Sequence, residues 1–160
     1  MTTTPHIASI TLDGITIKTR TPEVEYERNV AIADLIEWNH FAIKDGDGKH
    51  AEGPYDITLS TAENRVTFTA NSSTLESPLV VSLTLAPFRS VIKDYFLICE
   101  SYFDAVKSGN MPRIEAIDMS RRGLHNEGAE LISELMAEKV TMDSETARRL
   151  FTLICALHLK

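Results

Sequence analysis

The period of the hydrophobic pattern changes near Pro87, and this change constrains the fold more than any other feature of the sequence. Before Pro87, apolar residues alternate with polar ones in the segments 55–60, 65–70 and 79–85. Alternation places every second side chain on one face, which is typical of β-strands. After Pro87, apolar residues recur with the spacing of amphipathic helices. The sequence therefore predicts an α+β domain: an antiparallel sheet of four to five strands in the N-terminal half, packed against a helical layer from the C-terminal half.

Four helices are predicted in the C-terminal half from their end signals. The first ends at Gly109, because glycine readily adopts the left-handed conformation that follows a helix. Pro112 begins a short second helix that ends at Gly123, Asn126 caps the third, and Asp143 caps the fourth. The apolar stripe of the first helix is the most regular in the chain and consists of Val91, Ile92, Tyr95, Phe96, Cys99, Phe103 and Val106.

Two further elements are predicted before the strands at 55–85. Residues 6–12 alternate in β-prone side chains, and the turn formers at 13–14 lead into a short apolar segment at 15–17, so the sequence predicts a small hairpin. Thr21 is a good helix N-cap, and the proline after it suits a first helical turn. Together they predict a helix over Pro22–His40.

Length and charge restrict the number of domains and the class of partner. A chain of 160 residues is large enough to bury a self-sufficient core, and it shows no repeat or linker, so residues 1–160 are predicted to form a single domain. The formal net charge is -7, and the first 86 residues hold 6 basic against 12 acidic side chains. Such a chain repels phosphates and anionic lipid head groups. We therefore expect neither a nucleic acid nor a membrane surface as partner.

The two cysteines, Cys99 and Cys155, each lie within an apolar helical pattern and have no Cys-x-x-Cys partner. They are interpreted as buried, reduced thiols, because a reactive thiolate is usually stabilised at a helix N-terminus. A disulfide between them stays open as an alternative. The sequence shows no basic and apolar leader and no apolar run near the roughly 20 residues that span a membrane. We therefore expect a cytoplasmic protein.

Side chains that are able to form a site are most concentrated where the second and third of these helices are predicted to meet. The candidate binding residues are Arg121, Arg122, His125, Asn126 and Glu127. Two guanidiniums can bind a carboxylate or phosphate, and the amides that begin the next helix direct positive charge to the same place. A structural explanation competes with this one, since arginines suit the end of one helix, and Asn126 and Glu127 suit the start of the next. His125 is left as a ligand-binding group, a general base or a partner for a carbonyl.

Two more specific interpretations of these residues are disfavoured. Ser120, His125 and Glu127 are the residue types of a hydrolytic triad, but the Gly-x-Ser-x-Gly turn that exposes such a serine is missing. A helix-turn-helix would place the helix after Asn126 on DNA, yet that helix carries four glutamates against Lys139 alone. Repulsion from phosphates argues against DNA binding by this helix.

No metal and no cofactor are expected from the sequence. Asp45 and Asp47 resemble the start of a calcium loop, but His50 stands where that loop needs glycine, and Asp56 stands where it needs glutamate. We interpret this segment as a connection between two elements of the fold.

Four segments of the chain, 23–28, 87–96, 114–128 and 146–158, resemble a small alphaproteobacterial protein family that is known only as uncharacterised. The similarity extends over nearly the whole chain, and the last two segments are its most specific part. The resemblance implies a bacterial cytosolic setting. It supplies no catalytic residue, substrate or cofactor.

Two functional hypotheses follow from the sequence. The first is a noncatalytic regulatory or adaptor domain that binds a protein partner or self-associates, and it predicts an exposed apolar patch on a helix or sheet. The alternative is a small anion-binding enzyme or sensor with a pocket built around the Arg121 to Glu127 junction, assisted by Arg89, Lys93 or His158. It predicts that His125 and at least one of the two neighbouring arginines face a common concavity.

Overall fold

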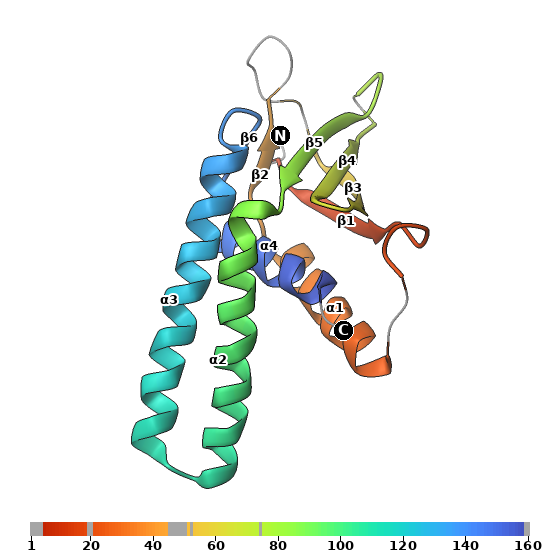
Figure 1. The fold of residues 1–160 in the computed structure, drawn as a ribbon. Coiled ribbons are helices and arrows are strands. Elements are labelled where there is room, and N and C mark those ends of the chain that lie inside the picture. The colour runs from red at the N-terminus through yellow and green to blue at the C-terminus, as the bar shows by residue number, and fades with distance from the viewer. Residues whose placement is uncertain (1–4, 19–20, 45–50, 52, 74, 159–160) are drawn as a thin grey trace.

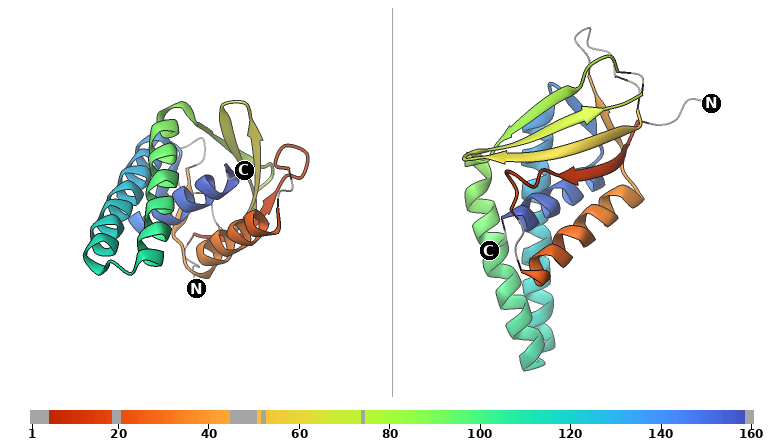
Figure 2. Two further views of the ribbon diagram at one scale, coloured as in Figure 1. Left: turned by 60° about the horizontal axis from the view of Figure 1, so that its bottom comes forward. Right: turned by 90° about the vertical axis from the view of Figure 1, so that its right-hand side faces the viewer.

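A sheet lies over a layer of helices, and two of these helices extend past the others as a long hairpin (Figures 1 and 2). The computed structural model describes residues 5–18, 21–44, 51, 53–73 and 75–158. Along the chain the elements are β1 (Ile7–Leu12), α1 (Pro22–Glu37), β2 (Phe41–Ile43), β3 (Tyr55–Ala62), β4 (Arg65–Asn71), β5 (Leu79–Thr84), a short 3-10 helix (Ala86–Phe88), α2 (Arg89–Ser108), α3 (Met111–Met136), β6 (Val140–Met142) and α4 (Ser144–Leu157). This arrangement confirms the α+β class that the change of hydrophobic period predicts.

The main sheet has four strands in the order β1-β3-β4-β5. β3, β4 and β5 form the predicted antiparallel meander. On the outer face, the hydroxyls of Thr67 and Ser82 lie 3.2 Å apart across neighbouring strands. The inner face packs into one apolar cluster with Leu35 of α1, Ile132 of α3 and Phe151 of α4. The alternating pattern thus gives a sheet with one polar and one buried face, as expected.

β1 joins this sheet in parallel, so the predicted hairpin at 6–17 is wrong and the sheet is mixed. The Asp13 carboxylate accepts hydrogen bonds from the Ile15 amide at 3.1 Å and from the Thr16 hydroxyl at 3.2 Å. These bonds hold the chain in a local turn and occupy an amide that a returning strand would use. β1 pairs with β3 instead, and the connection between them contains α1, because parallel neighbours require a long crossover.

The start of α1 is predicted correctly, and its end lies at Glu37 instead of His40. Asn39 explains the difference, because its buried side chain bonds to a strand. Its Oδ1 accepts a 2.7 Å hydrogen bond from the Ile7 amide, and its Nδ2 donates a 3.0 Å bond to the Ile7 carbonyl. These bonds tie the residue after α1 to the first strand, so the helix stops there.

A second sheet, made of β2 and β6, lies outside the sequence prediction. Phe41 pairs with Met142 and Ile43 with Val140 in an antiparallel ladder. Each strand has 3 residues, which is too short for an alternating pattern to be recognised. The ladder connects the segment after α1 to the link between α3 and α4.

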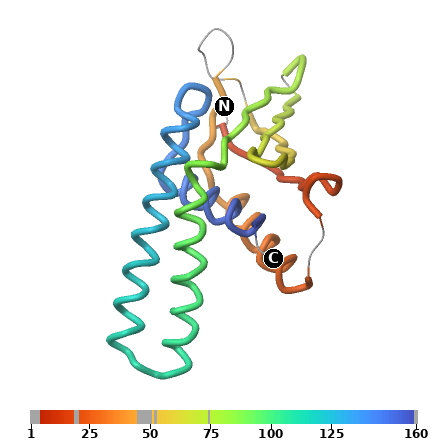
Figure 3. The backbone as a smooth tube through the Cα atoms, viewed as in Figure 1, coloured from red at the N-terminus to blue at the C-terminus, as the bar shows by residue number. Residues whose placement is uncertain are grey.

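The hairpin consists of α2 and a single long α3, which the tube in Figure 3 follows without a break. α2 ends at Gly109, where φ is 71°, as predicted. The predicted helix junction at Gly123 and the predicted cap at Asn126 are wrong, because α3 continues through both residues. Among the described residues, Gly109 is the one glycine with the positive φ that stops a helix. α4 is capped by Asp143 as predicted, and no described helix is long and apolar enough to cross a membrane.

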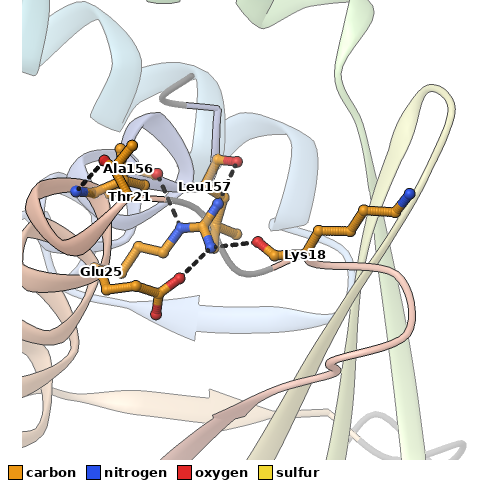
Figure 4. Close-up of polar contacts among 7 residues, drawn as sticks. Lys18, Thr21, Glu25, Ala156 and Leu157 are labelled. Atoms are coloured by element: carbon orange, nitrogen blue, oxygen red, sulfur yellow. Dashed lines mark hydrogen bonds and ion pairs between the residues drawn. The ribbon is translucent and has the colours of Figure 1, made fainter.

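Arg28 connects α1 to the C-terminal end of α4. Four of its partners, Lys18, Glu25, Ala156 and Leu157, are labelled in Figure 4. Arg28 is buried, and its Nε and Nη2 each donate a 3.4 Å hydrogen bond, to the carbonyls of Ala156 and Leu157. Its Nη1 donates to the Lys18 carbonyl at 2.9 Å and pairs with the Glu25 carboxylate at 3.3 Å. A cation at this position also complements the negative end of the α4 dipole.

Arg149 makes the reciprocal connection, from α4 to the C-terminal end of α1. Its Nη1 donates to the carbonyls of Asp34 at 2.7 Å and Trp38 at 2.8 Å. These bonds are exposed to solvent, whereas those of Arg28 are buried or partly buried. The two arginines therefore fix the packing of α1 on α4 from opposite ends, next to the candidate site described below.

Candidate functional site

The five predicted binding residues lie on consecutive turns of α3, and the structure divides them between two of its sides. Arg121 and His125, one helical turn apart, are half-buried and contact α2. Arg122, Asn126 and Glu127 are exposed. The structure therefore brings two of the five together and leaves three in solvent.

Arg121 is held in place by an acidic partner and an aromatic ring. Its Nη2 lies 2.5 Å from Asp118 Oδ1, and its guanidinium carbon lies 4.6 Å from the centroid of the Tyr102 ring. Arg122 binds the other oxygen of Asp118 at 3.1 Å, while its side chain is 70% exposed. Two guanidiniums share one carboxylate here, so this group of three residues keeps a net positive charge.

His125 lies behind Arg121, in a polar contact between three helices. Its Nε2 is 3.1 Å from the Tyr95 hydroxyl of α2 and 3.4 Å from the Thr152 hydroxyl of α4. Burial, and then the positive charges of Arg148 and Arg121, lower the pKa of His125 from 6.5 to about 4. The imidazole is therefore neutral at neutral pH, and it supplies no charge for anion binding.

The hydrolytic triad that the residue types suggested is not assembled. The exposed Ser120 hydroxyl donates a 3.3 Å hydrogen bond to the Ala116 carbonyl, one turn earlier in the same helix. The Glu127 side chain is exposed, and His125 bonds to α2 and α4. A base with a pKa near 4 also removes protons poorly at neutral pH.

The lowered pKa of His125 makes stability depend on pH. The unfolded chain, with a His125 pKa near 6.5, takes up a proton more readily than the folded chain, so stability should fall as the pH drops from about 6.5 to about 4. We expect a contribution of roughly 1–2 kcal/mol, because the imidazole keeps some contact with water. Urea unfolding of wild type and His125→Gln across this range measures it. The free energy of unfolding of the variant should therefore fall less steeply as the pH drops through this range. A control substitution at the exposed His40 should keep the contribution of His125.

A cavity of about 450 Å³ lies beside Arg121, between α1 and the hairpin. α4 lies between α1 and α2 in Figures 1 and 2, and three of its residues line this cavity. The lining residues are Glu27 of α1, Tyr95, Phe96, Cys99, Tyr102 and Phe103 of α2, Arg121 of α3, and Thr152, Cys155 and Ala156 of α4. His125 does not line the cavity itself, but it contacts two lining residues, Tyr95 and Thr152.

Both cysteines line this cavity as free thiols. Cys155 is buried and Cys99 is half-buried. Burial raises the pKa of both thiols above the ordinary value. The thiols therefore stay protonated at neutral pH and act as small apolar groups of the wall.

The residues that were expected to assist the cluster lie elsewhere. Arg89 donates a 2.9 Å hydrogen bond to Asn64 Oδ1 in the turn between β3 and β4, and Lys93 is exposed. His158 lines a different cavity, which it shares with Arg28. The described residues hold no cluster of three or more His, Cys, Asp or Glu side chains that would bind a metal, and the segment 45–50 lies outside the described residues.

Sequence reasoning found Arg121 and missed the residues that surround it. The sequence places Tyr95, Cys99 and Cys155 on apolar stripes, which is correct for each helix by itself. The feature that marks the cavity is that two such stripes, on α2 and α4, carry thiol and hydroxyl groups on the sides that line the space beside Arg121. This feature can be recognised only when the packing of the helices is known.

Comparison with known proteins places the chain among close relatives. A family model described as an uncharacterised protein family, UPF0262, matches residues 4–160. A UPF0262 protein of Rhodospirillum rubrum is 53% identical over 155 residues, which cover 97% of this chain and 93% of the relative. Those of Roseobacter denitrificans and Ruegeria pomeroyi are 50% identical over 153 residues (95% and 96% covered) and 48% identical over 157 residues (98% of each). No solved structure matches the chain significantly.

Proposed function

Because the chain belongs to the alphaproteobacterial UPF0262 family, whose description assigns no activity, we propose a function from its geometry: a noncatalytic regulatory or adaptor module that self-associates through the α2–α3 hairpin. The observation that carries this proposal is the apolar stripe of α2. Val91 and Ile92 are buried in the core, and Tyr95 is half-buried and packs on Phe151 of α4. Further along the same stripe, Phe103 and Val106 are 65% and 48% exposed.

The apolar stripe of α2 continues with helical spacing into the part of the helix that extends beyond α1 and α4. Figure 1 shows the distal parts of α2 and α3 extending beyond α1 and α4, so nothing in this part of the described chain covers them. Met111 and Met119 of α3 add further exposed apolar side chains to the same hairpin. Large exposed apolar side chains gathered on one element mark an interaction surface more often than chance exposure.

A second copy of the chain fits this surface for a geometric reason. A helical hairpin buries one side of each helix within the pair, and two hairpins that pack together complete a four-helix bundle. Symmetric dimers need a patch that is complementary to itself, which an apolar stripe is. The interface would use the free half of the α2 stripe, with Phe103 and Val106 at its centre.

The test is the mass of the protein in solution, and two helical positions form a matched pair for it. Val106 and Leu135 are 48% and 46% exposed, and each lies in the last turn of its helix, where an added lysine suits the dipole equally. We expect wild type and Leu135→Lys to sediment at twice the 17.8 kDa of one chain, and Val106→Lys to sediment as a monomer.

Analytical ultracentrifugation over a range of protein concentrations measures these masses, and circular dichroism checks that both variants stay folded. A monomeric wild type would overturn self-association. A Val106→Lys variant that remains as dimeric as Leu135→Lys would place any dimer contact away from the α2 stripe and would also refute the proposal.

A further inference from the structure

The cavity between α1 and the hairpin has the size and wall chemistry of a small-molecule site. Its volume of about 450 Å³ lies within the roughly 300–1,000 Å³ that such sites span. Four aromatic rings of α2 line one side, and α4 contributes the hydroxyl of Thr152, the thiol of Cys155 and the methyl group of Ala156. The rings belong to Tyr95, Phe96, Tyr102 and Phe103. Walls of this kind favour a flat apolar body, because rings pack in offset or edge-to-face arrangements.

Arg121 is the cation that lines this cavity, and it is arranged to bind an anion. Asp118 and Tyr102 fix its guanidinium, and of its nitrogens only Nη2 bonds to another described residue. A guanidinium carries five donor hydrogens, so it can take a carboxylate by two parallel bonds while it keeps Asp118. Arg122 shares Asp118 from outside the cavity, which leaves a net positive charge at this end.

Glu27 restricts the number of negative charges that a ligand can carry. It lines the α1 side of the cavity, across from the hairpin, and its charge reaches Cys99 in the wall. A phosphate or a dicarboxylate would place a second negative charge in the field of this glutamate. A ligand with one carboxylate at the Arg121 end avoids that repulsion.

We propose that this cavity binds a small aromatic monocarboxylate, with its carboxylate on Arg121 and its ring among the aromatic side chains of α2. The site shares Phe103 with the proposed self-association surface, whereas Val106 does not line the cavity and Arg121 is not part of that surface. Val106→Lys tests dimerisation and Arg121→Gln tests ligand binding, so the failure of one proposal can be told apart from the failure of the other.

The experiment titrates the protein with benzoate, 2-naphthoate and biphenyl-4-carboxylate, which increase in size and all fit within the cavity, and follows binding by calorimetry and ligand-observed NMR. 2-Naphthalenemethanol serves as the uncharged analogue of 2-naphthoate. Arg121→Gln should weaken the best carboxylate about tenfold or more, since a charge-assisted bidentate contact is lost, and should leave the alcohol unchanged. The matched control, Arg122→Gln, removes the neighbouring exposed charge and should change affinity less than about threefold.

A second readout locates the ligand. Cys99 lines the cavity and is half-buried, so bound 2-naphthoate should slow its alkylation by iodoacetamide, measured by mass spectrometry with Cys99→Ser as the blank. Melting temperatures confirm that each variant is folded. Absence of binding by all three carboxylates to the wild type would overturn the proposal. Equal loss in Arg121→Gln and Arg122→Gln, or binding that leaves Cys99 unprotected, would also overturn it.

Discussion

An Arg28→Met variant is expected to lose about 2–4 kcal/mol of unfolding free energy, which for a chain of this length lowers the melting temperature by roughly 5–15 °C. Arg28 is 2% exposed, and its guanidinium serves the carbonyls of Ala156 and Leu157 at the end of α4. Helix ends leave such carbonyls without partners of their own. Methionine fills similar space but donates no hydrogen bond, so these groups would lose a partner in the interior. Urea and thermal unfolding measure the loss.

Arg149→Met is the matched control for this prediction. Arg149 caps the end of α1 from α4 in the same way, but its hydrogen bonds to Asp34 and Trp38 are exposed, so water can replace them. We expect a loss of at most about 1 kcal/mol. Arg28→Lys should fall between the two, because lysine keeps the charge and presents a single donor group instead of a fork. Equal losses for Arg28→Met and Arg149→Met would contradict the role assigned to burial.

The elements that the sequence predicts well are those whose signals are local. The cap at Thr21, the left-handed stop at Gly109 and the cap at Asp143 each act within a few residues, and the structure has all three. The parallel pairing of β1 with β3 and the ladder of β2 with β6 join segments that are distant in the chain. No local pattern encodes such a partner, so these pairings follow from packing alone.

The candidate site shows the same division between local and distant information. Arg121 and His125 attract attention in the sequence because they stand near other polar residues, and they do share a side of α3. The other half of the cavity, with Tyr95 on α2 and Cys155 on α4, comes from helices whose relative placement no pattern in the sequence specifies. Arg28 is missed for a related reason, since a buried arginine has no sequence signature apart from the distant carbonyls that it serves.

Gly123 and Gly128 show why a glycine signal alone misleads. A glycine suits a helix end when φ is positive, but it also suits a place where two helices approach closely. α3 uses Gly128 for the second purpose: a Cβ there would lie 2.3 Å from Cδ2 of the Phe151 ring on α4. At Gly123, a Cβ would meet nothing within 4 Å. The close approach of α4 therefore accounts for the glycine at position 128, whereas position 123 has room for a larger residue.

A Gly128→Ala variant is expected to lose about 1–2 kcal/mol of stability, because overpacking at so close a contact costs about 2–3 kcal/mol and alanine gains only about 1 kcal/mol over glycine in a helix. The Phe151 ring cannot move aside easily, because it is fully buried and packs against Tyr95 and His125 at centroid distances of 5.7 Å and 6.1 Å. Urea unfolding of the variant and the wild type measures the difference.

The same substitution in the same helix should have the opposite sign at Gly123. Gly123→Ala removes the flexibility of an exposed helical glycine and meets no neighbour, so we expect a gain of about 0.5–1 kcal/mol. A loss of stability at Gly123 would indicate that the helix bends or ends there, as the sequence alone suggests. If instead Gly128→Ala raised stability as Gly123→Ala does, the close approach of α3 and α4 at Phe151 would be refuted. The pair of variants thus tests the continuous α3 on which the positions of Arg121 and His125 depend.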